Sequence, residues 1–133
     1  AESLLNQYPG RISIPKDWLI EELLEEDFRI MDIGPKTIQE YQEIISKSQT
    51  IFWNGNMGVS EREEYAKGTI EIAQAITKNV AAYTLAAGGD TIAAIRRDRL
   101  EQSFDFISTG GGATLALLAG EKLPGLTALG IQT

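Results

Sequence analysis

The order of its segments is the feature of this sequence that most constrains the fold. Three short apolar runs, at residues 51–53, 80–86 and 104–108, are each followed by a loop that contains glycine and then by a segment with helical periodicity. A further strand is predicted at 11–15. Strands that alternate with helices favour a parallel sheet with right-handed crossovers. We therefore predict an α/β fold.

This fold is expected to be a partial, Rossmann-like three-layer sandwich of about four parallel strands, with helices on both faces of the sheet. Residues 37–46 and 60–77 give the clearest helical patterns, and shorter helices are expected after the last two glycine loops. No linker or low-complexity segment interrupts residues 1–133, so they are expected to form one unit. Two pairs with capping-box spacing predict where the longer helices start: Thr37 with Glu40, and Ser60 with Glu63.

Composition excludes several kinds of site. The 133 residues include no cysteine and no histidine, which rules out disulfides, thiolate metal sites and an imidazole base. The net charge of −7 argues against nucleic acid or an anionic membrane as the main partner, because both attract basic surfaces. No apolar run is long enough to cross a bilayer, and a cytoplasmic protein is expected. The first residue, Ala1, indicates a processed chain or a piece of a longer one.

The loop Gly88-Gly89-Asp90-Thr91 joins a predicted strand to a predicted helix. Glycines let the backbone approach a ligand closely, and the first N–H groups of a helix can bind an anion. Asp90 is suited to Mg²⁺, which prefers oxygen ligands, and Thr91 to a phosphate oxygen. The same residues also fit a tight turn in which Asp90 is the N-cap.

The run Gly110-Gly111-Gly112 also stands directly before a predicted helix. Three consecutive N–H donors at the positive end of a helix would stabilise charge on a phosphoryl group in transfer. The alternative is a flexible helix entry that packs closely on its neighbours. Neither GxxxxGK[ST] nor GxGxxG occurs, so phosphate binding would fall to backbone N–H groups and Asp90.

A third loop, residues 54–58, follows an apolar strand. Asn54 could donate its amide N–H to a phosphate, and Gly55 and Gly58 could form a flat floor for a purine base. Glu61, expected in the first turn of the next helix, could accept the hydroxyls of a ribose. Each of these residue types also suits an ordinary turn or the helix dipole.

Taken in order, these loops resemble the successive motifs of the phosphoglycerate kinase family. Each motif alone is weak, whereas the series is specific, because its order and spacing agree with the family over nearly the whole chain. The segments that carry the resemblance are Asp32-Ile33-Gly34-Pro35-Lys36-Thr37, Trp53-Asn54-Gly55-Asn56-Met57-Gly58-Val59, Ala66-Lys67-Gly68-Thr69, Gly88-Gly89-Asp90-Thr91, Ile107-Ser108-Thr109-Gly110-Gly111-Gly112-Ala113 and Leu123-Pro124-Gly125.

The resemblance implies a two-domain glycolytic kinase, expected to be a monomer, that exchanges a phosphoryl group between 1,3-bisphosphoglycerate and ADP to give 3-phosphoglycerate and ATP. The nucleotide and its Mg²⁺ would lie on the C-terminal domain, of which this chain would be a part. Glu61 would hold the ribose, and Asn54 and Gly55 would contact the nucleotide. The Gly88–Thr91 loop would bind the phosphates, with Asp90 on the metal, and Gly110–Gly112 would steady the moving phosphoryl group.

The sequence departs from the family pattern at three positions: Asn56 stands where proline is usual, Ser60 where an aromatic residue is usual, and Ala87 where a third glycine is common. The resemblance also implies that the N-terminal domain and a phosphate-binding lysine lie outside this chain. The family's strand order, 3-2-1-4-5-6, would leave residues 12–14 without their usual neighbour. They would pair elsewhere, pair with another chain or lie outside a sheet.

If the kinase interpretation holds, residues 1–133 alone are expected to show no kinase activity and at best weak nucleotide binding. Two other interpretations stay open on the sequence. The chain could be a non-catalytic α/β scaffold or relic that binds no nucleotide, or it could be another nucleotide-binding α/β protein.

Overall fold

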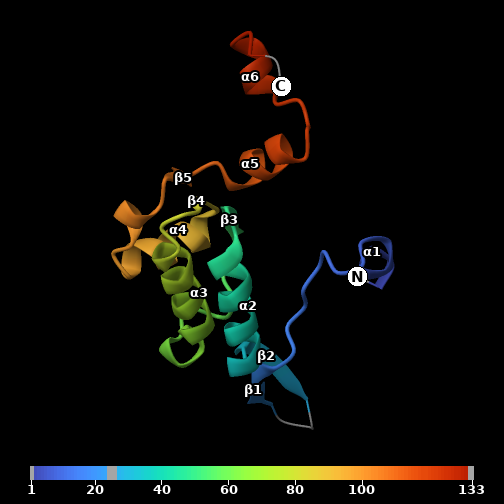
Figure 1. Ribbon diagram of the computed structural model, residues 1–133, viewed down its shortest axis with the longest axis vertical. Helices are drawn as coiled ribbons and strands as arrows, with labels where there is room; N and C mark the ends of the chain where they lie inside the picture. Colours follow the sequence, from blue (N-terminus) through green and yellow to red (C-terminus); the bar gives the residue numbers. More distant parts are fainter. Residues whose placement is uncertain (1, 24–26, 132–133) are drawn as a thin grey trace.

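The computed structural model describes residues 2–23 and 27–131 and confirms an α/β fold whose parallel sheet is flanked by helices. The sheet has the order β3-β4-β5, with β3 (Thr50–Asn54), β4 (Tyr83–Ala87) and β5 (Phe106–Ser108) all parallel (Figure 1). This order follows the order of the strands along the chain. The three strands predicted after residue 50 are therefore confirmed.

Three helices accompany the sheet: α2 (Pro35–Lys47), α3 (Lys67–Lys78) and α4 (Gly89–Arg97). The helices α2 and α3 lie side by side, and α3 also contacts α4 (Figure 1). Two short 3₁₀ turns complete this region, η2 (Glu63–Tyr65) before α3 and η3 (Glu101–Ser103) before β5.

The core lies between these helices and one face of the sheet. Register places Trp53, Ala86 and Ile107 on the same face. Trp53 is 4% exposed and stacks on Phe104, with ring centroids 6.1 Å apart. The remaining buried members of this cluster are Ile33, Ile38, Ile72, Ala73, Ile76 and Ile95.

The opposite face of the sheet carries Phe52, Leu85 and Phe106 in register. None of the three belongs to the buried cluster of the described residues, and Phe106 is 51% exposed. The buried core therefore lies on one face of the sheet.

A separate antiparallel hairpin, β1 (Trp18–Glu22) and β2 (Phe28–Ile33), precedes α2 and is not evident from the sequence. The predicted strand at 11–15 is wrong, because these residues form no strand. A strand needs a neighbour to satisfy its N–H and C=O groups, and the described chain provides none there. Residues 12–14 instead lie outside a sheet, beside α2, where the Tyr41 hydroxyl donates to the Ser13 carbonyl at 3.3 Å.

The capping box predicted at the start of α2 is also wrong. The helix begins at Pro35 with Gly34 as its N-cap, so Thr37 lies inside the first turn. Asp17 acts from outside the helix, and its carboxylate accepts the N–H groups of Lys36 and Thr37 at 3.0 and 2.8 Å. Burial alone would raise the pKa of Asp17, but hydrogen bonds from the Thr37 hydroxyl and from these N–H groups lower it below its usual value.

The second capping box, at Ser60, does not start a helix, since α3 begins only at Lys67. The N–H of Ser60 bonds to the Gly58 carbonyl at 2.8 Å, and its own carbonyl accepts a hydrogen bond from Arg97 Nη1 at 2.5 Å. These contacts hold a turn at Ser60. Contacts between distant residues thus outweigh the local helical periodicity of residues 60–66.

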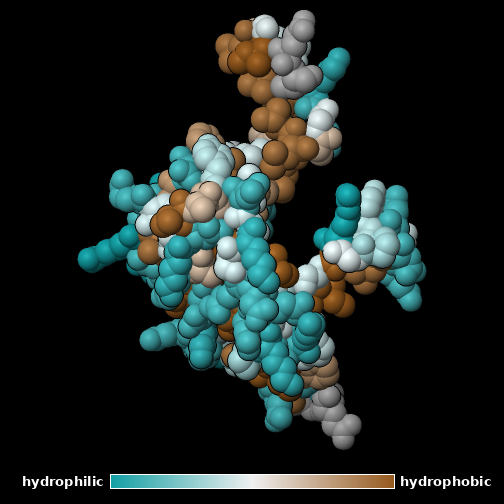
Figure 2. Space-filling view, viewed as in Figure 1, coloured by the Kyte–Doolittle hydropathy of each residue, from teal (hydrophilic) through white to brown (hydrophobic). Residues whose placement is uncertain are grey.

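Three short helices extend from this body: α1 (Glu2–Gln7), α5 (Gly111–Leu118) and α6 (Pro124–Ala128) (Figure 1). None of them contains a buried residue. Figure 2 shows the hydrophobic surface of α5 and α6 open to solvent. No helix within the described ranges is long and apolar enough to cross a membrane.

Candidate functional site

The carboxyl ends of the three parallel strands bring the predicted loops to one edge of the sheet. Asn54 at the end of β3 is in register with Ala87 at the end of β4, and Ala87 with Ser108 at the end of β5. The glycine loops follow directly. In open α/β sheets this carboxyl edge is where ligands bind.

The loops after β3, β4 and β5 contact one another through Asn54, Gly88 and Gly111. Asn54 Nδ2 donates to the Ala87 carbonyl at 2.9 Å. A Cβ added at Gly88 would lie 3.0 Å from Asn54 Nδ2, and one added at Gly111 would lie 2.9 Å from Gly88 Cα. Neither glycine leaves room for a side chain, and the φ of +98° at Gly88 also favours glycine. The structure therefore brings the three predicted loops together.

A further hydrogen bond joins the Gly55 loop to α4. The Thr91 hydroxyl, which is fully buried, accepts the N–H of Gly55 at 2.7 Å. The Gly55 carbonyl in turn accepts the indole N–H of Trp53 at 2.8 Å. Thr91 thus positions the Gly55 loop, and its hydroxyl is buried in this structure.

The N-termini of α4 and α5 meet at the contact between Gly88 and Gly111. Neither helix has a side-chain hydrogen bond at its N-cap. The first bonds inside each helix come from the N–H groups of Ile92 and Thr114, so the preceding N–H groups have no partner among the described residues. Two positive helix ends with unpaired donors therefore lie next to each other, which suits an anion that carries several oxygens.

Asp90 lies in the first turn of α4 and is exposed. The N-cap of this helix is Gly88, so the alternative in which Asp90 is the N-cap is wrong. Gly110 is the N-cap of α5, and its N–H donates to Ser108 Oγ at 3.3 Å. Gly112 has open space around it, with nothing within 4 Å of an added Cβ.

Glu61 lies on an exposed turn before η2, and not in the first turn of a helix as predicted. The turn is fixed to α4 by the hydrogen bond from Arg97 to the Ser60 carbonyl. Within the described residues, no hydrogen bond joins Glu61 to the other predicted site residues. The segment that carries Glu61 is therefore anchored to α4. Within the described residues, Glu61 makes no hydrogen bond to Asn54 or Gly88.

Asp32 is a buried carboxylate that sequence reasoning places only in a turn. Its Oδ1 accepts the N–H of Ile33 at 2.8 Å, and its Oδ2 accepts the N–H of Gly68 in α3 at 2.7 Å. Burial raises the pKa of Asp32, although the two hydrogen bonds partly oppose that rise. A Cβ at Gly58 would fall 2.4 Å from Asp32 Oδ1, so the 54–58 loop packs directly on this carboxylate. The signal in the sequence is the pair of glycines, Gly58 and Gly68, that leave space for it.

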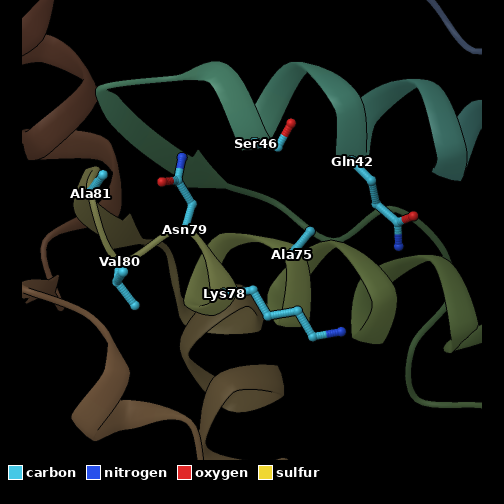
Figure 3. A pocket seen from close by; sticks show the side chains of 7 residues that line it. All are labelled: Gln42, Ser46, Ala75, Lys78, Asn79, Val80 and Ala81. Atoms are coloured by element: carbon cyan, nitrogen blue, oxygen red, sulfur yellow. The ribbon is translucent and has the colours of Figure 1, made fainter.

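A pocket of about 390 Å³ lies at the opposite edge of the sheet, away from all of these residues. Figure 3 shows it between Gln42 and Ser46 on α2 and Ala75 and Lys78 on α3. Here Asn79 Nδ2 donates to the carbonyls of Ile45 and Ser48, at the end of α2. The pocket has no unpaired helix N-terminus and lies at the amino edge of the strands, so we do not place the functional site there.

Comparison with known proteins shows which family this chain belongs to. The family model of phosphoglycerate kinase matches residues 10–121, a range that contains every loop described above. The chain belongs to the phosphoglycerate kinase family.

Individual phosphoglycerate kinases match most of this chain. That of Herpetosiphon aurantiacus is 48% identical over 104 residues, which cover 78% of this chain and 26% of that protein. That of Acidobacterium capsulatum is 40% identical over 129 residues, covering 97% and 30%. The crystal structure of phosphoglycerate kinase from Pyrococcus horikoshii aligns with a TM-score of 0.85 and 39% identity, covering 96% of this chain and 35% of that one. This chain thus spans between 26% and 35% of the length of these three phosphoglycerate kinases.

Proposed function

We propose that this chain forms the nucleotide-binding part of a phosphoglycerate kinase, which transfers a phosphoryl group between 1,3-bisphosphoglycerate and ADP to give 3-phosphoglycerate and ATP. Membership of the family supports the reaction. The observation that supports the place of the nucleotide is the contact between Gly88 and Gly111, where two helix N-termini with unpaired N–H groups lie side by side.

In this proposal the N–H groups at the start of α4, from Gly89 and Asp90, bind the phosphates of ADP or ATP. Asn54 donates to the same phosphates, since its amide has a second N–H beyond the one bonded to Ala87. Glu61 accepts the hydroxyls of the ribose. Thr91 acts indirectly, because its buried hydroxyl holds Gly55 in place.

The N–H groups of Gly110, Gly111 and Gly112 are proposed to stabilise charge on the phosphoryl group during transfer. Phosphoryl transfer depends mainly on the positioning of the reactants and on charge stabilisation, and it requires no covalent nucleophile from the protein. Backbone donors at a helix start point in a common direction and suit this role. The absence of histidine and cysteine from the sequence is therefore compatible with the reaction.

Asp90 fits the magnesium ion that accompanies such a nucleotide. Proteins usually hold Mg²⁺ through one or two carboxylates together with phosphates and water. Asp90 is an exposed carboxylate beside unpaired N–H donors, and the described residues contain no cluster of three acidic side chains that would hold a metal by themselves. Bound there with the nucleotide, Mg²⁺ would neutralise phosphate charge.

The acid substrate is proposed to bind to parts of the whole protein other than these residues. None of the predicted site residues is basic, whereas 3-phosphoglycerate carries a carboxylate and a phosphate. We therefore expect no turnover by residues 1–133 alone. For the whole protein we propose a monomeric enzyme of the cytoplasm, in keeping with the glycolytic role of the family.

Titration of the chain with Mg-ADP tests the nucleotide site. Trp53 is a suitable reporter because its indole N–H bonds to Gly55, and a Trp18→Phe background removes the emission of the exposed second tryptophan. We expect saturable fluorescence change and amide shifts confined to residues 54–61, 88–91 and 110–112. Asp90→Asn should weaken binding of ADP with Mg²⁺ more than binding of ADP without it.

Two results would contradict this proposal. Silence in the titration favours a scaffold that binds no nucleotide, and shifts centred on other residues favour a different nucleotide site. Robust phosphoryl transfer from the chain with ADP, 1,3-bisphosphoglycerate and Mg²⁺ would refute the expectation that the acid substrate needs further parts of the protein.

A further inference from the structure

Asn56, in the loop after β3, and Ser60, at the start of the turn that follows, contact each other directly. Asn56 Nδ2 donates to Ser60 Oγ at 2.6 Å. Ser60 is 5% exposed, so water does not replace this partner easily. A buried hydroxyl without a partner is unfavourable, and Asn56 supplies the partner that the Ser60 hydroxyl needs.

The loop around Asn56 is held on both sides but not at Asn56 itself. The N–H of Gly55 bonds to Thr91, and the N–H of Met57 bonds to Thr69 Oγ1 at 3.0 Å. Within the described chain, the backbone of Asn56 makes no hydrogen bond. Its side-chain bond to Ser60 is therefore what fixes this residue.

Ser60 is the residue immediately before Glu61, and contacts reach it from three directions. Its N–H bonds to Gly58, its carbonyl accepts Arg97 Nη1 of α4, and its hydroxyl accepts Asn56. The backbone contacts set where Ser60 lies. The side-chain contact sets how the turn that begins there is joined to the loop after β3.

We propose that Asn56 and Ser60 form a positioning pair. Their hydrogen bond joins the loop after β3 to the turn on which Glu61 is presented to the nucleotide. This inference rests on the proposed role of Glu61 at the ribose. The backbone of Asn56 makes no hydrogen bond within the described chain, so the side-chain bond supplies rigidity that the loop otherwise lacks at this residue. Asn56 and Ser60 are positioning residues that need not touch the nucleotide.

The pair depends on a single hydrogen bond. Asn56 Oδ1 is buried and has no partner among the described residues, so the other end of the amide does not secure the side chain. Removal of either partner should therefore loosen the link between the turn and the loop after β3, and removal of both should do little more than removal of one.

Comparison of two ligands tests the positioning role. Asn56→Ala and Ser60→Ala should each weaken binding of Mg-ADP by about three- to tenfold, the effect of one lost hydrogen bond. Binding of Mg-pyrophosphate, which has no ribose, should be unchanged. Ser46→Ala is the matched control, because it removes an exposed hydroxyl that bonds only to a helix carbonyl, that of Glu43 at 2.9 Å. An equal loss for both ligands, or no loss for Mg-ADP, would overturn the proposal.

Hydrogen exchange of the free chain tests the pair without any ligand. The N–H of Arg62, which bonds to the Val59 carbonyl at 3.0 Å, should exchange faster in either single variant, and no faster again in the double variant. Amides of α3 should be unaffected. If exchange responds in this way and the chain binds neither ligand, the proposed nucleotide site fails and the pair stands as a purely structural link. Unchanged exchange at Arg62 contradicts the pair itself.

Discussion

Gly88 and Gly89 are neighbours with opposite tolerance for a side chain. A Cβ at Gly88 would lie 3.0 Å from Asn54 Nδ2, and the φ of +98° is one that residues with a Cβ rarely adopt. A Cβ at Gly89, the first residue of α4, would meet nothing within 4 Å. Glycine is therefore required at position 88 by the backbone conformation and by the close approach of the loop after β3. At position 89 glycine is not required by space, and it leaves the N–H at the helix start accessible.

Alanine substitutions at these two positions should separate the two effects. Gly88→Ala should destabilise the chain by about 1–3 kcal/mol, the usual cost of a strained backbone conformation. Gly89→Ala should leave stability unchanged or raise it by up to about 1 kcal/mol, because the unfolded chain loses conformational freedom. Urea unfolding followed by circular dichroism measures both, and equal effects would contradict the described conformation of Gly88.

Asp105 is expected to make the stability of the chain depend on pH. Hydrogen bonds from the N–H of Thr84 at 2.7 Å and from its hydroxyl at 2.9 Å lower the pKa of Asp105 below the ordinary value of 3.8. Since the pKa is lower in the folded than in the unfolded chain, the stability that this carboxylate contributes is present above pH 3.8 and is lost as pH falls through the folded pKa.

We expect the urea midpoint of the unaltered chain to exceed that of Asp105→Asn at pH 6. The difference should narrow as the pH falls below 3.8, because the protonated carboxyl then resembles the amide. Unfolding curves at several pH values, followed by circular dichroism, provide the measurement. A difference that stays constant down to pH 2.5 would show that Asp105 is not held as a carboxylate by Thr84.

At the scale of elements, the candidate site depends on hydrogen bonds between a loop and the start of a helix. Thr91 in α4 fixes the loop after β3 through the N–H of Gly55, and Asp32 in β2 fixes the start of α3 through the N–H of Gly68. Both groups are buried, so neither bond can be exchanged for one with water.

Thr91→Val keeps the shape of the side chain and removes its hydroxyl. The N–H of Gly55 then lacks its partner, and we expect a loss of about 1–3 kcal/mol of stability. Thr91→Ser, which keeps the hydroxyl, should retain the environment of Trp53 as judged by its emission maximum, whereas Thr91→Val should shift that maximum. A valine variant as stable as the unaltered chain would show that the Thr91 hydroxyl does not stabilise the Gly55 loop.

Elements with local signals could be predicted from the sequence, and those that depend on distant residues could not. The strands β3, β4 and β5 and the start of α4 follow from apolar runs and glycines that are adjacent in the chain. The late start of α3 depends instead on Arg97, which binds the Ser60 carbonyl across 37 positions. In the site, the loops are predictable, but the buried carboxylate of Asp32 is not, because its partner Gly68 lies 36 positions away.

At the scale of the whole molecule, the candidate site joins a packed body to a helix that has little packing of its own. The helices α3 and α4 each bury four or more residues, whereas α5 buries none. An isolated helix shorter than about 12 residues is marginal in water, and α5 has eight residues. Its start, at Gly111, is nevertheless in contact with Gly88.

This imbalance predicts two classes of amide in hydrogen exchange. Amides of α3 should exchange only through global unfolding, and those of α5 should exchange nearly as fast as in an unstructured peptide. Mg-ADP should slow exchange in α5 if Gly110–Gly112 bind its phosphates, and part of the binding free energy is then spent in ordering this helix. That requirement is a physical reason for weak nucleotide binding by residues 1–133. Protection of α5 equal to that of α3 without nucleotide would contradict it.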